Sequence, residues 1–141
     1  VVRPTGFFSD MGQVLEMARK GRVYLIGSGD CRVNPIHGAD LAVCCADMLE
    51  QDRRELEVGG PQILTWRQIA ELALRTLDRP VKITPVPRWI ACLATRVTRL
   101  FNRHQAGLMA FFTTLATRDV VAPKAGSHTL EAHYRELAGR R

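Results

Sequence analysis

VVRPTGFF, residues 1–8, is the stretch from which the fold can be inferred. Val1 and Val2 are typical of a buried strand, and Pro4-Thr5-Gly6 predicts a loop that leads into a helix. A hydrophobic strand at a sheet edge needs other strands to cover it. We therefore expect this chain to be the C-terminal part of a larger α/β protein.

Outward from this stretch, strands and helices alternate. We predict helices over residues 7–20, 37–50 and 65–79, and short strands over 22–26, 31–33, 55–58 and 81–84. The glycine-rich segment 27–30 predicts a hairpin between the first two of these strands. Ser9 or Asp10 is expected to cap the first helix, and Thr65 with Gln68 matches a capping box. In the second helix we expect the following side chains to point inward: Leu41, Cys44, Cys45, Met48 and Leu49.

After residue 85 the pattern predicts helices only, over 87–101, 106–116 and 129–137. The first of them has Arg88, Arg96 and Arg99 beside an apolar side formed by Ile90, Leu93, Ala94, Val97, Leu100 and Phe101. We expect a boundary near residue 86, with residues 87–141 as a helical C-terminal extension. The basic amphipathic helices are open to three interpretations: packing against the chain itself, binding of a protein partner, or contact with a membrane.

Composition excludes several classes of protein. The chain has 141 residues, 46% hydrophobic and 24% charged, which suits a folded domain. Its net charge of +6 is uneven, because residues 75–141 hold 12 Lys/Arg against 4 Asp/Glu. No DNA-reading motif or interleaved aromatic residues accompany this charge, so we expect no nucleic-acid partner. Four cysteines without metal-ligand spacing suggest buried thiols in a reducing cytoplasm and no metal site.

Three segments, in this order, resemble the C-terminal half of an extended or atypical short-chain dehydrogenase/reductase: VVRPTGFF (1–8), NPIHGADLA (34–42), and EVGGP (57–61) leading into LTWRQIA (64–70). Within that family, this sequence most resembles the NAD(P)-binding branch whose members are NmrA-like or similar to a complex-I subunit. The resemblance implies a Rossmann-type fold in which residues 1–86 supply the last sheet strands and the substrate-side lobe. The N-terminal dinucleotide-binding half would be absent.

The resemblance also implies site residues. Pro4, Thr5 and Gly6 would lie at the carboxyl end of a late parallel strand, close to the nicotinamide end of NAD or NADP. The substrate side would be formed by Phe7, Phe8, Met11, Asn34 and His37. The alternative is that residues 4–6 form an ordinary turn and that Phe7 and Phe8 belong to the core. Asp40, in a first helical turn, can simply complement the helix dipole.

Two family motifs are missing from this sequence. Segment 27–32 has Arg32 where a phosphate loop needs its third glycine, and the Tyr-x-x-x-Lys pair is absent. We therefore assign no catalytic residue and expect the chain to be inactive and free of cofactor by itself. Its expected partners are the N-terminal Rossmann half and further copies of itself, with no membrane contact. The alternative function is a non-enzymatic module that binds a protein or a membrane through its basic C-terminal helices.

Overall fold

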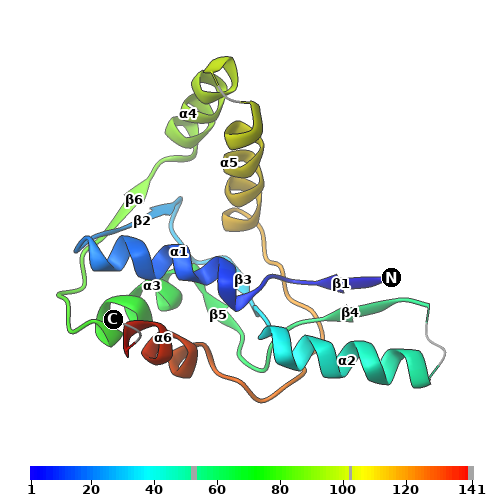
Figure 1. The fold of residues 1–141 in the computed structure, drawn as a ribbon. Helices are drawn as coiled ribbons and strands as arrows, with labels where there is room; N and C mark the ends of the chain where they lie inside the picture. Colours follow the sequence, from blue (N-terminus) through cyan, green and yellow to red (C-terminus); the bar gives the residue numbers. More distant parts are fainter. Residues whose placement is uncertain (52–53, 102, 140–141) are drawn as a thin grey trace.

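Short strands form three separate pairs in the computed structural model, which describes residues 1–51, 54–101 and 103–139 (Figure 1). β1 (Val2–Pro4) pairs in parallel with β4 (Leu56–Val58), and β2 (Val23–Ile26) pairs in parallel with β6 (Ile83–Val86). β3 (Arg32–Val33) runs antiparallel to β5 (Leu64–Thr65). Parallel pairs need long crossover connections, which the helices supply, so the predicted α/β class is confirmed.

The helices of the described residues follow the predicted pattern closely. They are α1 (Phe8–Arg19), α2 (Gly38–Glu50), α3 (Trp66–Thr76), α4 (Arg88–Phe101), α5 (Arg103–Ala116) and α6 (Leu130–Gly139). The capping box of α3 is confirmed, since Thr65 Oγ1 accepts from the Gln68 amide and Gln68 Oε1 accepts from the Thr65 amide. The predicted cap of α1 is wrong. Its N-cap is Phe7, which makes no side-chain capping hydrogen bond.

The predicted hairpin is also wrong. β2 and β3 do not pair with each other, although a short turn joins them. The turn holds Gly27 and Gly29 at positive φ and turns the chain away, toward β5 and α3. The Gly29 carbonyl accepts from the Arg67 amide at 3.0 Å, so the segment is held by the start of α3. A glycine-rich link predicts a turn, but the pairing of its strands depends on distant segments.

The hydrophobic core lies between α1, α3 and α6 and beneath β2. Its buried members include Phe8, Met11, Leu15, Val23, Ile69, Leu74, Leu130 and Tyr134. The Tyr134 hydroxyl donates to the Met11 carbonyl at 2.8 Å, which joins α6 to α1 across the sequence. The C-terminal helix is therefore an integral part of this core.

α4 and α5 form an antiparallel hairpin that stands out from the rest of the molecule (Figure 1). The segment after α5 returns to the body, where the Val120 amide donates to the Arg32 carbonyl at 2.8 Å and the Gly59 amide to the Pro123 carbonyl at 2.9 Å. The boundary near residue 86 stays a prediction. Within the described residues, the projecting part is the α4–α5 hairpin, and residues 119–139 contact the body.

Two helices expose apolar side chains that a core would normally bury. Leu49 of α2 is 82% exposed, so the prediction that it points inward is wrong, and Val43 on the same helix is exposed as well. α4 also exposes most of its large apolar side chains. Apolar periodicity identified both helices, but nothing else in the described chain covers these faces.

Candidate functional site

The segment predicted to contact a cofactor lies where β1 ends and α1 begins. Pro4 is opposite Val58 in the parallel pair, and the Thr5 amide donates to the Val58 carbonyl at 3.2 Å. The buried Thr5 hydroxyl donates to the Asn34 carbonyl at 2.6 Å. A Cβ added to Gly6 would meet no other atom within 4 Å, so space is open beside that backbone. The carboxyl end of a parallel strand, followed by a helix N-terminus, is where open α/β sheets bind ligands.

Asn34 is fully buried and joins three segments of the chain. Its Nδ2 donates to the carbonyls of Gly60 (3.2 Å) and Ala122 (2.8 Å), while its Oδ1 accepts from the Ala122 amide. Gly60 approaches so closely that an added Cβ would lie 1.9 Å from the Pro35 carbonyl oxygen. The Asn-Pro and Gly-Gly pairs thus fit together as a junction behind the end of β1. The predicted substrate contact of Asn34 stays untested, but this side chain has its hydrogen bonds filled within the chain.

The other predicted substrate residues separate into two environments. Phe8 and Met11 are 3% and 2% exposed and belong to the core, whereas Phe7 is 36% exposed. His37 is partly buried and accepts a hydrogen bond from the Ala39 amide as the N-cap of α2. The Phe8 ring lies 5.7 Å from the His37 ring, edge to face. The structure therefore brings Phe8 and His37 together but leaves Met11 inside the helical core.

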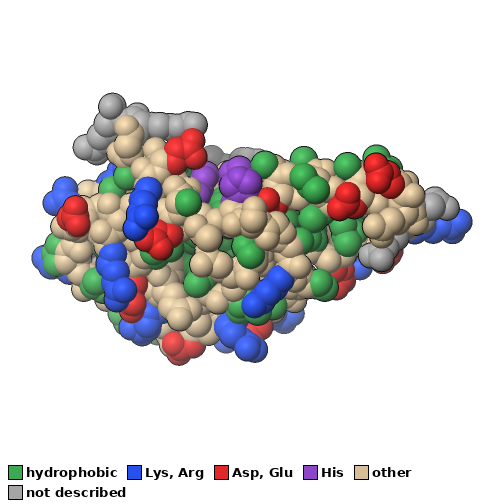
Figure 2. All heavy atoms as spheres, turned by 90° about the horizontal axis from the view of Figure 1, so that it is seen from below, with side chains coloured by type: hydrophobic (Ala, Val, Ile, Leu, Met, Phe, Trp, Pro, Cys, Tyr) green, Lys and Arg blue, Asp and Glu red, His purple; other side chains and the backbone are tan. Residues whose placement is uncertain are grey.

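A histidine cluster lies beside this group, and histidine side chains gather on the face seen in Figure 2. The rings of His37 and His128 stack with centroids 4.3 Å apart, and His128 Nδ1 lies 2.7 Å from Asp40 Oδ1. Asp40 Oδ2 accepts from the amides of Ser127 and His128. Burial raises the pKa of the Asp40 carboxyl, but the hydrogen bonds and charge of His128 and the Ser127 amide outweigh it and lower that pKa.

Asp40 therefore does more than complement the helix dipole. It holds the loop before α6 against the first turn of α2. Gly126, at φ +79°, permits this approach, since an added Cβ would lie 2.2 Å from the Asp40 carboxyl group. The described residues contain no cluster of three or more His, Cys, Asp or Glu side chains that could hold a metal ion.

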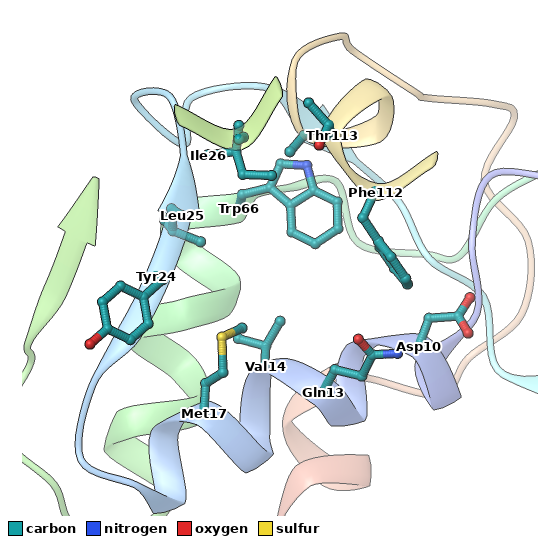
Figure 3. Close-up of a pocket in the computed structure, with 12 residues that line it drawn as sticks. Asp10, Gln13, Val14, Met17, Tyr24, Leu25, Ile26, Trp66, Phe112 and Thr113 are labelled. Carbon is teal, nitrogen blue, oxygen red and sulfur yellow. The ribbon is translucent and has the colours of Figure 1, made fainter. Parts of the chain in front are cut away.

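An apolar groove of about 230 Å³ lies between α1, β2 and the α4–α5 hairpin (Figure 3). In Figure 3 the rings of Trp66 and Phe112 face Val14 and Met17 across this space. The Trp66 indole nitrogen donates to the Leu115 carbonyl at 3.3 Å, which fixes the ring between α3 and α5. The remaining lining residues are Asp10, Gln13, Tyr24, Leu25, Ile26, Ala91, Thr113 and Ala116.

This groove was not predicted from the sequence. None of the predicted substrate residues lines it, although α1 supplies one wall and begins at Phe8, two residues after Gly6. Val14 belongs to the apolar stripe of α1, and residue spacing alone cannot show that one end of such a stripe faces a groove. Among the described residues, α5 contacts the body at Trp66 and at β2, and the groove lies beside these contacts.

Comparison with known proteins gives no match to a family model. Among curated proteins, the chain is 38% identical over 93 residues to the chloroplastic divinyl chlorophyllide a 8-vinyl-reductase of Zea mays, and 37% identical over 93 residues to that of Arabidopsis thaliana. Each match covers 62% of this chain but only 23% and 22% of the relatives, so the chain spans about a quarter of their length. These reductases are extended short-chain dehydrogenases/reductases. The predicted resemblance to that superfamily is confirmed.

Solved structures show weaker likeness. UDP-glucose 4-epimerase of Thermus thermophilus, in complex with NAD, has a TM-score of 0.47 and 19% identity, covering 55% of this chain and 27% of the epimerase. GDP-mannoheptose C4 reductase of Campylobacter jejuni, with NADP bound, has a TM-score of 0.44 and 13% identity, covering 61% of this chain and 36% of the reductase. Both TM-scores lie below 0.5, so the resemblance to short-chain dehydrogenases/reductases rests on the curated relatives.

Proposed function

We propose that this chain is the substrate-side portion of an NAD(P)-dependent or NAD(P)-binding oxidoreductase and is inactive by itself. The observation that carries the proposal is the 93-residue match to vinyl reductases, in a chain that also forms an apolar groove next to α1. The vinyl reductases act on divinyl chlorophyllide a, as their name says. A groove walled by Trp66 and Phe112 suits a flat apolar part of a substrate.

The residues present fit one end of a dinucleotide. The open space beside Gly6, at the end of a parallel strand, allows a flat ring to approach the backbone. Segment 27–32 offers no binding site for the phosphates of the dinucleotide, because it lies between β2 and β3 and does not lead into a helix. A bound NADH or NADPH would supply the hydride for a reduction. Pro4, Thr5 and Gly6 would hold its reactive ring, and the groove would orient the substrate and exclude water.

The test is a chimera in which this chain replaces the matching C-terminal part of the Zea mays reductase. NADPH binding is measured by fluorescence titration, and turnover with divinyl chlorophyllide a by absorbance. We expect the chain alone to bind no NADPH and the chimera to bind it and to turn over substrate. NADPH binding by the chain alone, or a chimera that binds NADPH but never turns over substrate, would contradict the proposal.

Two neighbouring threonines of α5 provide a matched pair for the groove. Thr113 lines it, whereas Thr114 is exposed elsewhere on the helix. Thr113→Phe fills the groove and should raise the chimera's KM for substrate at least tenfold while NADPH binding is kept. Thr114→Phe adds the same ring away from the groove and should leave both quantities unchanged. Equal effects of the two variants would show that the groove is not the substrate site.

A further inference from the structure

Four large apolar side chains of α4 lie open to solvent. Trp89, Leu93, Val97 and Leu100 are 67%, 54%, 48% and 82% exposed. At about 100° per residue they fall within roughly 80° of the helix surface, so they form one continuous stripe. Scattered exposed apolar residues are ordinary on a protein surface, but an aligned stripe with an exposed tryptophan marks a contact surface.

The intramolecular partner of α4 does not use this stripe. The buried and half-buried side chains of α4 are Ala91, Ala94, Thr95 and Thr98. They lie on the opposite side of the helix at the same 100° spacing, and small residues let α4 approach α5 closely. The hairpin is thus held together by the small-residue side of α4. Its large apolar side is left outward, on a hairpin that stands out from the core (Figure 1).

The charge around the stripe has a single sign. Residues 79–118 contain seven Lys or Arg residues and no Asp or Glu. Arg88, Arg96 and Arg99 are exposed and fall within roughly 100° along one edge of the stripe. A long arginine side chain can lay its methylene groups beside an apolar surface while its guanidinium reaches an anionic group. Apolar and cationic contacts are therefore offered side by side.

We propose that α4 docks on an anionic lipid surface, with the helix lying in the plane of the membrane interface and the stripe inserted among the lipids. A second copy of the hairpin fits less well, because it would bring the same arginines against one another without an acidic residue to pair with them. No helix within the described parts of the chain is long and apolar enough to cross a membrane, and interfacial docking needs none. This proposal departs from the sequence-based expectation of no membrane contact.

The test is flotation of the full chain with vesicles of equimolar phosphatidylglycerol and phosphatidylcholine, with pure phosphatidylcholine vesicles for comparison and no nucleotide present. We expect binding to the anionic vesicles that is at least tenfold tighter and that weakens as salt is added. Changing Leu93 and Leu100 to Ser should abolish flotation. Because both residues are exposed, the variant should keep its circular dichroism spectrum.

The charge variant is Arg88→Gln, Arg96→Gln and Arg99→Gln together, and its matched control is Arg22→Gln, Arg75→Gln and Arg135→Gln. Both lose three positive charges, but the control residues are exposed and lie outside the hairpin. At roughly 1 kcal/mol per basic residue near the surface, the hairpin variant should bind at least tenfold more weakly, and the control should stay near wild type. Equal losses in the two variants would mean that net charge alone attracts the chain, which overturns docking by α4.

Tryptophan fluorescence provides a second readout. Trp89 is exposed and the chain's other tryptophan, Trp66, is 7% exposed, so a blue shift on vesicles should disappear in Trp89→Phe while flotation remains. A protein occupant would give a different result. Concentration-dependent dimers in sedimentation that are lost in the Leu93/Leu100 variant, without vesicle binding by the wild type, would make a second copy the occupant and overturn the proposal.

Discussion

α3 and α4 are both strongly amphipathic helices, yet they lie in contrasting surroundings. α3 turns its apolar side into the core, where Ile69, Ala70, Ala73 and Leu74 are fully buried. α4 turns small residues toward its neighbour and leaves its large apolar residues outside. The difference teaches that amphipathic spacing establishes that a helix forms, whereas burial depends on which other segments are available to cover it.

The same contrast separates the two ends of the molecule. The body of α1, α3 and α6 is closed by contacts between residues more than 100 positions apart, such as the Tyr134–Met11 hydrogen bond. The hairpin of α4 and α5 has mainly local contacts, and its attachment to the body is near the groove. The two candidate binding surfaces, the groove and the α4 stripe, thus lie where the chain makes few long-range contacts with itself.

The largest expected difference in stability comes from the same leucine-to-alanine substitution made separately in α3 and in α4. Leu74→Ala leaves a cavity in the closed core and should lower the free energy of unfolding by about 2–5 kcal/mol. Leu93→Ala removes a side chain that is 54% exposed, and its effect should stay within about 0.5 kcal/mol. Equilibrium urea unfolding followed by circular dichroism measures both. Similar losses for the two variants would mean that the Leu93 face is covered in solution.

Asp40→Asn should have the next largest effect and lower the free energy of unfolding by about 1–3 kcal/mol at neutral pH. The reason is that the buried carboxylate accepts hydrogen bonds from Ser127 and His128. The folded-state pKa of Asp40 is lowered, so its stabilisation is present above the unfolded pKa near 3.9 and is lost as pH falls through the folded value. Wild type and variant should therefore converge in urea midpoint below about pH 4. Asp47→Asn, an exposed change on the same helix, should show no such convergence.

Much of the fold could be predicted from local signals. The capping box of Thr65 and Gln68 depends on residues three apart, and the helix periodicities on residues three or four apart, so sequence spacing suffices for them. The prediction of a β2–β3 hairpin was wrong because strand pairing depends on segments further along the chain. Here β2 pairs with β6, and β3 pairs with β5. The prediction that Leu49 points inward was wrong for a related reason. Its periodic position could not show that no other segment of the described chain would cover that face of α2.

The site could be predicted only in part. Pro4, Thr5 and Gly6 lie at the end of a parallel strand, as their turn chemistry and the resemblance implied, and their contact with a cofactor stays a prediction. The junction at Asn34 uses Ala122, 88 residues away, and the groove uses α5, so neither has a local signal. The roles of residues whose partners lie far away in the sequence could be identified only from the three-dimensional structure.

Thr65→Ala sharpens the comparison at the level of single hydrogen bonds. Loss of the N-cap should cost α3 about 1 kcal/mol, since the Gln68 amide would have no side-chain acceptor. The Thr114 hydroxyl in the hairpin donates back to the Ala110 carbonyl within its own helix, so Thr114→Ala should be neutral or slightly stabilising. Hydrogen exchange at the Gln68 amide, together with urea unfolding, checks the pair. A larger loss for Thr114→Ala would contradict this distinction between body and hairpin.

The smallest expected effect concerns the link that returns the chain from the hairpin to the body. Asp119 accepts from the Arg32 amide and pairs with its guanidinium at 2.8 Å, and these bonds lower the pKa of the Asp119 carboxyl. Both side chains are largely exposed, at 62% and 47%, so solvent screens the pair and Asp119→Asn should lower Tm only slightly. That difference should vanish in 1 M salt, because exposed ion pairs are screened within about 3 Å there. Glu131→Gln, which breaks a local pair with Arg135 inside α6, should change Tm still less, because no distant segments separate when it is lost.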